Sequence, residues 1–325
     1  MNLSDRNSKI VRMGVIGTGR IAYRFYPEAE AVSGIRVVGV YNPHPESAKK
    51  YSERFQLEFE TDDLEFFLER IDAVYIASPH ETHAAYIRQA LERKKHVLCE
   101  KPMVLNKEEA IALYELAERN GCILMEAIKT AYCPGFLQLL SITADGMIGE
   151  IRDVEAAFTK LERPDSRELN DLNYGGSFLE LGSYPLLAII KLLGTEYKTL
   201  RFETIQDEKG IDLYTKAYFR FTQGMATAKT GLGVKSEGEL IISGTKGYIL
   251  VPAPWWKTTE IEVRFEDPEK NQKFHYEYLG DGLRYEISAF IASINDIRKR
   301  EQNLQAKESV VMAEIMEAWR DWRRH

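Results

Sequence analysis

A glycine-rich turn near the start of the chain has residue types that could bind a dinucleotide. Residues 17–22, Gly-Thr-Gly-Arg-Ile-Ala, follow the apolar run Met13–Ile16 and precede a helical stretch. The first glycine of such a turn permits a tight bend, and the second lets a pyrophosphate approach the backbone at the start of the helix. A GxGxxA match alone is weak, but its place at the first strand of a repeated β-α-β pattern favours binding over a simple turn. The candidate cofactor contacts here are Gly17, Thr18, Gly19, Arg20 and Ile21.

The end of the second expected strand bears on the choice between NAD and NADP. An acidic side chain there bonds the ribose 2′-hydroxyl and repels a 2′-phosphate. This chain has Tyr41-Asn42-Pro43-His44, which contains neither an acidic residue nor an arginine. Asn42 could contact the ribose or a phosphate, or it could form an Asx turn before Pro43. We expect modest discrimination between NAD and NADP, with a slight preference for NADP.

A lysine follows a later apolar run, in Cys99-Glu100-Lys101-Pro102. The carboxyl ends of parallel strands are where open α/β sheets gather their ligands. Lys101 is therefore a candidate functional group, and an ordinary surface lysine is the alternative.

The elements that must position these residues alternate between apolar runs and helices in the first part of the chain. Continuous apolar strands joined by helices indicate a parallel sheet covered on both faces. The expected strands after the first are Val37–Tyr41, Ala73–Ala77, His96–Cys99 and Ile123–Met125, with helical segments at 46–55, 80–93 and 106–120.

The pattern changes after about residue 128 to stretches with two-residue periodicity, which predict a large, mainly antiparallel sheet. Helices are expected at Gly135–Asp145, Ser177–Leu193, 283–300 and 306–323. We therefore predict a dinucleotide-binding domain at 1–128, beginning with a polar leader at 1–9, and a substrate-binding and oligomerisation domain at 129–325.

Composition excludes several classes of protein. The chain has 325 residues, and its 50 acidic and 43 basic residues give a net charge of −7 without a long basic run. Nucleic acid is therefore not an expected partner. Three cysteines without CxxC spacing indicate neither a disulfide framework nor a zinc site, and we expect no metal. No export signal or apolar stretch of membrane-spanning length is present, so we expect a cytoplasmic protein without a membrane partner.

The whole chain resembles the Gfo/Idh/MocA family, which includes glucose–fructose oxidoreductase and inositol dehydrogenase. The resemblance rests on GTGRIA at 17–22, SPHETH at 78–83, EKP at 100–102, MEA at 125–127 and GGSFLELGSY at 175–184. It implies a doubly wound Rossmann domain followed by an α/β domain with an open sheet. Such sheets often form dimers or tetramers, so the resemblance predicts a homodimer or homotetramer.

The resemblance also assigns chemistry to Lys101, which in this family points at the oxygen of the reacting carbon. The following Pro102 is commonly preceded by a cis peptide. Glu100 would anchor the turn beside the cofactor, or serve as a buried salt-bridge partner.

The second family motif usually ends in histidine, but here it ends in Tyr184. Tyrosine also occurs in the branch that contains glucose–fructose oxidoreductase, pentose dehydrogenase and dihydrodiol dehydrogenase. A phenol is a poor base at neutral pH, but a neighbouring ammonium lowers its pKa, and Lys101 is the expected neighbour. The alternative for Tyr184 is a helix tyrosine that covers the core.

Other predicted contacts follow from the same resemblance. Ser78, Pro79 and His83 would border the nicotinamide, and Lys129 is a candidate substrate contact. Glu180 lies four residues before Tyr184, on the same face of one helix, and would orient the substrate. Gly175 and Gly176 would let the chain pass close to the nicotinamide.

We therefore expect reversible hydride transfer between NAD or NADP and a sugar, polyol, diol or related carbonyl compound. One alternative is a non-catalytic NAD(P)-binding regulator, and another is an NAD-assisted glycoside hydrolase. Retention of both Lys101 and Tyr184 favours an enzyme, because a sensor needs only the cofactor pocket.

Overall fold

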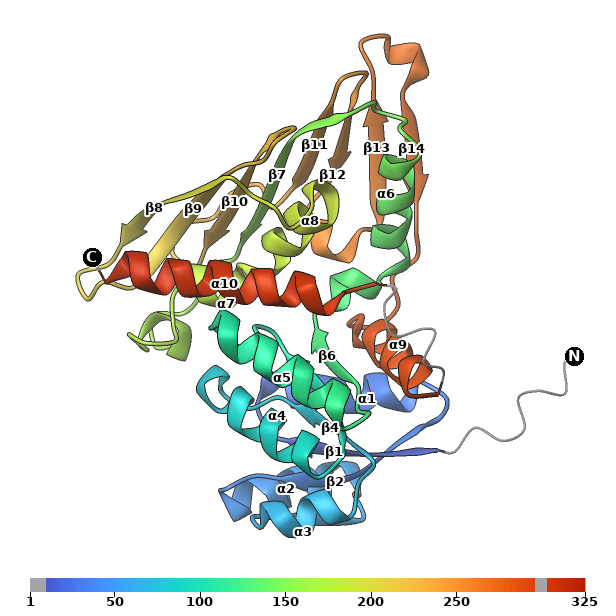
Figure 1. Cartoon of the computed structure of the whole chain (residues 1–325), viewed down its shortest axis with the longest axis vertical. Helices are drawn as coiled ribbons and strands as arrows, with labels where there is room; N and C mark the ends of the chain where they lie inside the picture. The colour runs from blue at the N-terminus through green and yellow to red at the C-terminus, as the bar shows by residue number, and fades with distance from the viewer. Residues whose placement is uncertain (1–9, 296–302, 325) are drawn as a thin grey trace, which may run out of the picture. The chain divides into compact units, whose positions relative to one another are not determined.

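The computed structural model describes residues 10–295 and 303–324 (Figure 1). They form two compact units. The first combines the chain up to Lys129 with Leu279–Ala313, and the second combines Thr130–Tyr278 with the chain from Glu314 onward. No helix in the described ranges is long and apolar enough to span a membrane. The leader predicted at 1–9 lies outside the described residues.

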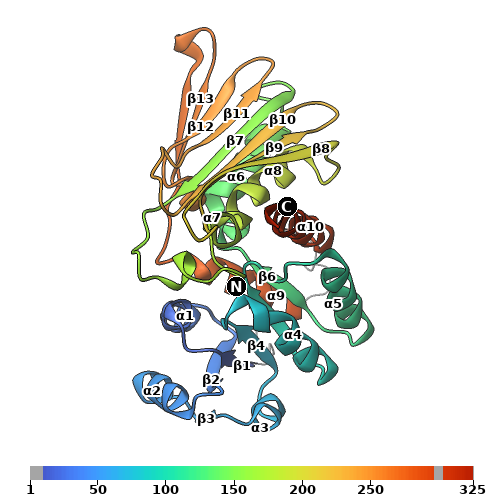
Figure 2. The same cartoon turned by 90° about the vertical axis from the view of Figure 1, so that its left-hand side faces the viewer.

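The first unit contains a six-stranded parallel sheet in the order β3-β2-β1-β4-β5-β6, which confirms the predicted doubly wound fold. Figure 2 shows α1 and α2 on one side of this sheet and α4 and α5 on the other. The strands are β1 Val11–Ile16, β2 Ile35–Tyr41, β3 Phe59–Thr61, β4 Ala73–Ile76, β5 His96–Glu100 and β6 Leu124–Ala127, and the helices are α1 Arg20–Glu30, α2 Pro45–Phe55, α3 Leu64–Glu69, α4 His83–Glu92 and α5 Lys107–Arg119.

The order of strands reverses direction at β1, which pairs with β2 on one side and β4 on the other. In open α/β sheets such a switch point leaves a crevice at the carboxyl ends of the strands, where ligands bind. The turns after β1, β2, β4 and β5 all leave this edge of the sheet, so the fold brings the predicted cofactor-binding segments to one end of the unit.

A later segment completes the first unit through helix α9 (Leu283–Asn295). Glu28 on α1 accepts two hydrogen bonds from the Arg284 guanidinium, from Nε at 3.1 Å and from Nη2 at 2.8 Å. It also accepts one from the Asp281 backbone N–H at 3.1 Å. A side chain at Gly280 would lie 2.0 Å from a Glu28 carboxylate oxygen. This packing places Leu279–Ala313 with the first unit, whereas our prediction assigns 129–325 to the second domain. Residues 296–300, the end of the helix expected at 283–300, lie outside the described residues.

The second unit is built on an eight-stranded sheet in the order β14-β13-β12-β11-β7-β10-β9-β8. Only β7 and β10 pair in parallel, so the prediction of a mainly antiparallel sheet is confirmed. The strands are β7 Ile151–Thr159, β8 Thr199–Gln206, β9 Asp212–Arg220, β10 Met225–Gly231, β11 Leu240–Gly244, β12 Tyr248–Val251, β13 Glu260–Arg264 and β14 Gln272–His275.

Helices α6 (Pro134–Ala144), α7 (Ser177–Leu181) and α8 (Ser183–Leu193) pack against this sheet. Helix α10 (Ala306–Arg323) contributes residues to both units. Its Trp319 is fully buried, with its ring 5.2 Å from those of Phe178 and Phe202. The end of α10 therefore anchors the start of α7, the helix that carries part of the second family motif.

Candidate active site

The two glycines of the first turn have different structural requirements. Gly17 has a φ of +94°, and a side chain there would lie 2.7 Å from the Ala77 backbone oxygen, so the chain itself requires glycine. Gly19 has an ordinary φ of −77° and is exposed, and a Cβ there would meet only that oxygen at 3.9 Å. No described residue of this unit requires glycine at this position. Open backbone at the start of α1, which has no side-chain cap, fits the approach of a dinucleotide pyrophosphate.

Asn42 connects the glycine turn to the end of β2. Its Nδ2 donates a hydrogen bond to Thr18 Oγ1 at 2.8 Å, and its Oδ1 accepts one from the His44 backbone at 2.9 Å. The backbone N–H of Gly17 also donates to the Tyr41 carbonyl at 3.0 Å. Asn42 therefore forms the Asx turn that the sequence allows, and its contact with a ribose stays a prediction.

The Glu100-Lys101-Pro102 turn is anchored by partly buried polar contacts at the end of β5. The Tyr75 hydroxyl donates to Glu100 Oε1 at 2.6 Å, and the Lys101 backbone N–H donates to Glu100 Oε2 at 3.3 Å. Burial raises the pKa of Glu100, while Lys101 and the Tyr75 hydroxyl oppose that rise. The Lys101–Pro102 peptide is cis, as the resemblance implies. Glu100 thus has the contacts of an anchor for this turn.

His83, the first residue of α4, lies between two of the predicted cofactor-binding segments. Its ring is fully buried, with Nε2 2.9 Å from the Ser78 carbonyl oxygen and Nδ1 3.0 Å from that of Pro102. Ser78 Oγ in turn lies 2.7 Å from Thr82 Oγ1. The structure therefore brings Ser78, His83 and the turn after β5 together.

Further titratable groups are buried at the same end of the first unit. Lys129 is buried, and its Nζ donates to the Asp281 carbonyl at 2.7 Å. Glu126 accepts a hydrogen bond from the Met103 backbone at 3.0 Å. Glu286 on α9 is 1% exposed, and its Oε2 has no hydrogen-bond partner among the described residues. Burial raises the pKa of Glu126 and of Glu286, and it lowers the pKa of Lys129.

Glu286 is a polar group that the sequence analysis missed. It lies on the buried face of α9 beside Leu283, Ile287 and Phe290. A carboxylate on an otherwise apolar helix face is the signal that could have marked it. The amine of Lys129 is engaged with the turn before the same helix, so its role as a substrate contact stays a prediction.

Tyr184 and Glu180 belong to the second unit. Gly182 separates α7 from α8 but keeps helical dihedral angles, with φ −60° and ψ −30°. Both side chains are half-buried. The Tyr184 ring lies 5.0 Å from that of Phe158, which stacks on Trp256 at 3.6 Å. Tyr184 thus has aromatic support on one side without being enclosed in the core.

Asp212 on β9, which the sequence analysis also missed, holds the start of α7. Its Oδ2 accepts hydrogen bonds from Ser177 Oγ and the Phe178 backbone, both at 2.8 Å, and from Thr215 Oγ1 at 2.9 Å. A side chain at Gly176, where φ is +99°, would lie 1.8 Å from Asp212 Oδ1. Gly176 is therefore required by packing inside this unit, whatever approaches from outside. Short polar residues on a strand gave no local signal for this cluster.

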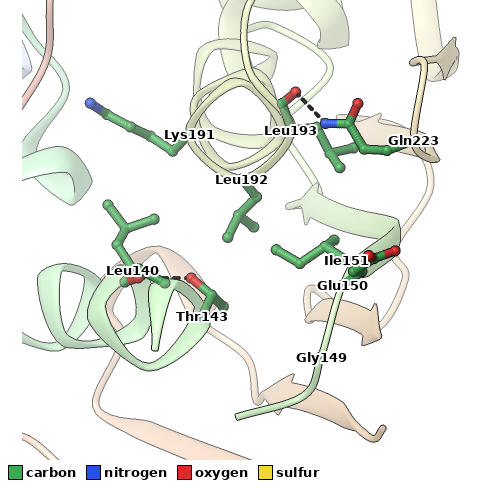
Figure 3. A pocket seen from close by; sticks show the side chains of 10 residues that line it. Leu140, Thr143, Gly149, Glu150, Ile151, Lys191, Leu192, Leu193 and Gln223 are labelled. Atoms are coloured by element: carbon green, nitrogen blue, oxygen red, sulfur yellow. Dashed lines mark hydrogen bonds between the residues drawn. The ribbon is translucent and has the colours of Figure 1, made fainter. Parts of the chain in front are cut away.

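A pocket of about 680 Å³ in the second unit is separate from the predicted site residues (Figure 3). Its lining combines apolar side chains with the polar residues Thr143, Glu150, Lys191 and Gln223. None of the residues predicted to bind cofactor or substrate lines it. It lies between α6, α8 and the start of β7, and its lining residues are Leu140, Thr143, Ala144, Gly149, Glu150, Ile151, Lys191, Leu192, Leu193 and Gln223.

Comparison with known proteins decides the family. Residues 11–128 match a family model described as an oxidoreductase family with an NAD-binding Rossmann fold, and residues 136–250 match the Gfo/Idh/MocA C-terminal domain. The chain belongs to the Gfo/Idh/MocA family. As a member of this family, it is an NAD(P)-dependent oxidoreductase, which confirms the expected enzyme class and cofactor.

Members with known activities resemble much of the chain. A dTDP-3,4-didehydro-2,6-dideoxy-alpha-D-glucose 3-reductase from Saccharopolyspora spinosa is 32% identical, covering 78% of this chain and 80% of its own. A trans-1,2-dihydrobenzene-1,2-diol dehydrogenase from Sus scrofa is 27% identical over 94% of this chain and 95% of its own. A 3-ketoreductase from Actinomadura kijaniata, solved with NADP and TDP-benzene, is 26% identical with a TM-score of 0.81, covering 95% and 96% of the two chains.

The predicted residues fall into two groups in this family member. Those of the first unit gather at the carboxyl ends of its strands, and those of the second lie on α7 and α8. The first group is Gly17, Thr18, Gly19, Arg20, Ile21, Asn42, Ser78, Pro79, His83, Glu100, Lys101 and Lys129, and the second is Glu180 and Tyr184.

Proposed function

We propose that this chain transfers a hydride between a nicotinamide cofactor and a carbon that bears a hydroxyl or carbonyl group in a sugar, polyol or diol. The observation that carries the proposal is the open backbone at Gly19, directly before α1. The packing around Gly19 would accommodate a side chain, so the glycine leaves open space that an external group can occupy. Family membership and the Glu100-Lys101-Pro102 turn at the same end of the sheet support the same activity.

In this proposal, Gly17, Gly19 and the first turn of α1 hold the pyrophosphate, and Asn42 lies near the adenosine ribose. The bound nicotinamide supplies hydride donation and acceptance. Lys101 stabilises negative charge on the substrate oxygen, and the Tyr184 hydroxyl gives or takes the proton at that oxygen. Glu180 orients the substrate. The Actinomadura kijaniata ketoreductase has also been solved with a lysine changed to alanine and with a tyrosine changed to phenylalanine.

The substrate class follows from the relatives. One is a reductase of a nucleotide-linked deoxysugar, another is a dehydrogenase of a cyclic diol, and a ketoreductase was solved with TDP-benzene. The sugar reductase and the diol dehydrogenase share a substrate in which a carbon of a six-membered ring bears a hydroxyl or keto group. We therefore propose a ring-shaped sugar or diol as the substrate of this chain.

We further propose that the protein is a homodimer or homotetramer that forms through the eight-stranded sheet. Alternate residues of its strands, opposite the buried apolar ones, include Tyr214, Tyr218 and Leu250, which are half-buried. On the same face of the sheet, Glu262 is 8% exposed and forms ion pairs with Arg264 and Lys273. Light scattering that finds a monomer at micromolar concentration would contradict this. The three cysteines are buried and form no disulfide among the described residues, in keeping with the proposed cytoplasmic location.

The proposed activity is tested by following the absorbance of reduced nicotinamide with NAD and NADP against aldoses, polyols, cyclic diols and nucleotide-linked sugars. A net change in reduced cofactor with at least one class is the expected result. Cofactor binding without turnover on any substrate would favour the regulator. Glycoside cleavage with the cofactor recycled would favour the hydrolase, and product analysis separates it from net oxidation.

A further inference from the structure

Both ring nitrogens of His83 face backbone carbonyl oxygens. Nε2 lies 2.9 Å from the Ser78 oxygen, Nδ1 lies 3.0 Å from the Pro102 oxygen, and the side chain is fully buried. A carbonyl oxygen can only accept, so each contact is a hydrogen bond only when the nitrogen that faces the carbonyl carries a proton. Neither nitrogen is directed toward an external ligand. This geometry differs from that expected of a residue that binds the cofactor directly.

The two carbonyls belong to segments that leave neighbouring strands. β4 and β5 pair in parallel up to Ile76 and Cys99. Beyond that point the chain enters the Ser78-Pro79 loop on one side and the Lys101-Pro102 turn on the other. The ring of His83 bridges these two segments where the paired register has ended. Because the side chain is enclosed, it can hold both segments without being displaced by solvent.

The charged groups around the ring determine how many of these bonds it makes. Lys101 lies on the turn whose Pro102 carbonyl the ring contacts, and the His80 ring lies 5.6 Å away on the preceding short helix. Burial and the Lys101 charge lower the pKa of His83, while the two carbonyls oppose this. A neutral imidazole donates to one carbonyl at a time, whereas an imidazolium donates to both. In the neutral form one nitrogen donates to one carbonyl while the ring packs against the other segment, and in the charged form both segments are bonded.

We propose that His83 is a positioning residue, which holds the Lys101-Pro102 turn against the Ser78-Pro79 loop and thereby fixes Lys101. It acts without binding the cofactor itself, which changes the role that the sequence motif suggests. The inference rests on the proposed function, because Lys101 is catalytic only there. The physical link between the two segments can nevertheless be measured in the free protein.

The first experiment measures hydrogen–deuterium exchange of the full chain without cofactor. His83→Phe keeps a ring but removes both ring nitrogens, and His83→Gln keeps one amide donor group. We expect His83→Phe to speed exchange by about ten-fold or more in peptides covering 77–82 and 101–105, with a smaller effect in His83→Gln. His275→Gln, on an exposed histidine of β14, is the matched control and should change neither segment. Unchanged exchange in both segments of the His83 variants would overturn the proposal.

The second experiment separates positioning from cofactor binding. In His83→Gln, the Kd for NADP should stay within about three-fold of the wild type, while kcat at saturating cofactor falls by about ten-fold or more. His83→Phe should lose more kcat than His83→Gln, since the amide restores part of the link. A Kd raised more than ten-fold with kcat retained would identify His83 as a cofactor ligand and overturn the proposal. If His83→Phe does not fold, His83→Gln decides. If the wild type turns over no substrate, the proposed function fails, but the exchange experiment still tests whether His83 links the two segments.

Discussion

The Tyr75 hydroxyl donates a 2.6 Å hydrogen bond to Glu100 Oε1, directly before Lys101 in the chain. Tyr75 is fully buried, and its ring stacks on Phe25 at 3.8 Å. A phenylalanine at position 75 would keep this stacking and remove only the hydroxyl. The relationship therefore allows the anchoring of the Lys101 turn to be tested with little change in packing.

Tyr75→Phe should destabilise the protein by about 1–3 kcal/mol, because a half-buried carboxylate oxygen loses its donor. Burial raises the pKa of Glu100 and the Tyr75 hydroxyl opposes that rise, so its removal raises this pKa further. The hydrogen bond that this substitution removes stabilises the ionised form of Glu100. The cost should therefore be greatest at high pH and shrink as the pH falls and Glu100 is protonated. Urea unfolding at several pH values measures it, and a cost that grows toward low pH would contradict this account.

Gly19→Val should preserve the fold and weaken cofactor binding. Its φ of −77° suits any residue, and a Cβ would meet only the Ala77 oxygen at 3.9 Å, so the cost in stability should be about 1 kcal/mol or less. We expect the Kd for NAD(P) to rise at least ten-fold, about 1.4 kcal/mol, as measured by quenching or enhancement of cofactor fluorescence. Unchanged affinity in the folded variant would refute the assignment of this turn.

Gly17→Ala is the contrasting variant. Its φ of +94° and a Cβ 2.7 Å from the Ala77 backbone oxygen should cost about 1–3 kcal/mol in stability even without cofactor. Thermal unfolding of the two variants should therefore distinguish Gly17, which the fold requires, from Gly19, which only cofactor binding requires. Equal stability of Gly17→Ala and the wild type would show that this reading of the turn is wrong.

Glu286→Gln should change the pH dependence of stability. Burial raises the pKa of Glu286 well above its ordinary value of 4.5, so the folded protein keeps a proton that the unfolded chain loses. The stability linked to this group is present below about pH 4.5 and is lost as the pH rises through the folded pKa, by up to about 1.4 kcal/mol per pH unit. Because glutamine does not ionise, the Glu286→Gln variant does not lose stability in this way.

The variant should thus gain stability relative to the wild type as pH rises from about 5 to 8. Chemical denaturation across this range tests the expectation. Glu53→Gln, on an exposed carboxyl of α2, is the control and should show no such trend. A Glu286→Gln variant that becomes relatively less stable with rising pH would show that this carboxylate is ionised and paired in the folded protein.

Lys101→Ala and Tyr184→Phe should each lower kcat by about 100-fold or more if chemistry limits the rate, with cofactor affinity nearly unchanged. Because both groups are proposed to act on one oxygen and its proton, the double variant should lose less than the product of the single effects. Steady-state kinetics on the substrate from the cofactor screen measure this. Near-normal turnover in Tyr184→Phe would make the tyrosine structural and require another acid.

Much of the first unit follows from local sequence. Buried parallel strands form continuous apolar runs, so the strands expected at Ala73–Ala77 and His96–Cys99 agree closely with β4 and β5. The short β3, Phe59–Thr61, was missed because three residues carry too little periodicity. The helix expected at Ser177–Leu193 is divided into α7 and α8 at Gly182, whose helical dihedral angles leave little trace in the pattern.

The contacts that support the candidate site were less predictable. Glu28 and Arg284 are 256 residues apart, and Ser177 and Asp212 are 35 apart, so no local pattern relates them. Motifs identified Lys101 and His83, but only the structure shows that the ring nitrogens of His83 face two backbone carbonyls. Sequence can thus nominate chemical groups, while the long-range packing that orients them has to be observed.

The most direct test of the proposed activity is transfer of deuterium from C4 of reduced nicotinamide to a sugar or diol carbon. Wild-type protein would be incubated with NADPH or NADH stereospecifically deuterated at either C4 face, together with the ketone form of the substrate found by the screen. Mass spectrometry and NMR of the product should place one deuterium on the new carbinol carbon, from one face only. Cofactor oxidation without deuterium in the product, from either face, would contradict direct hydride transfer.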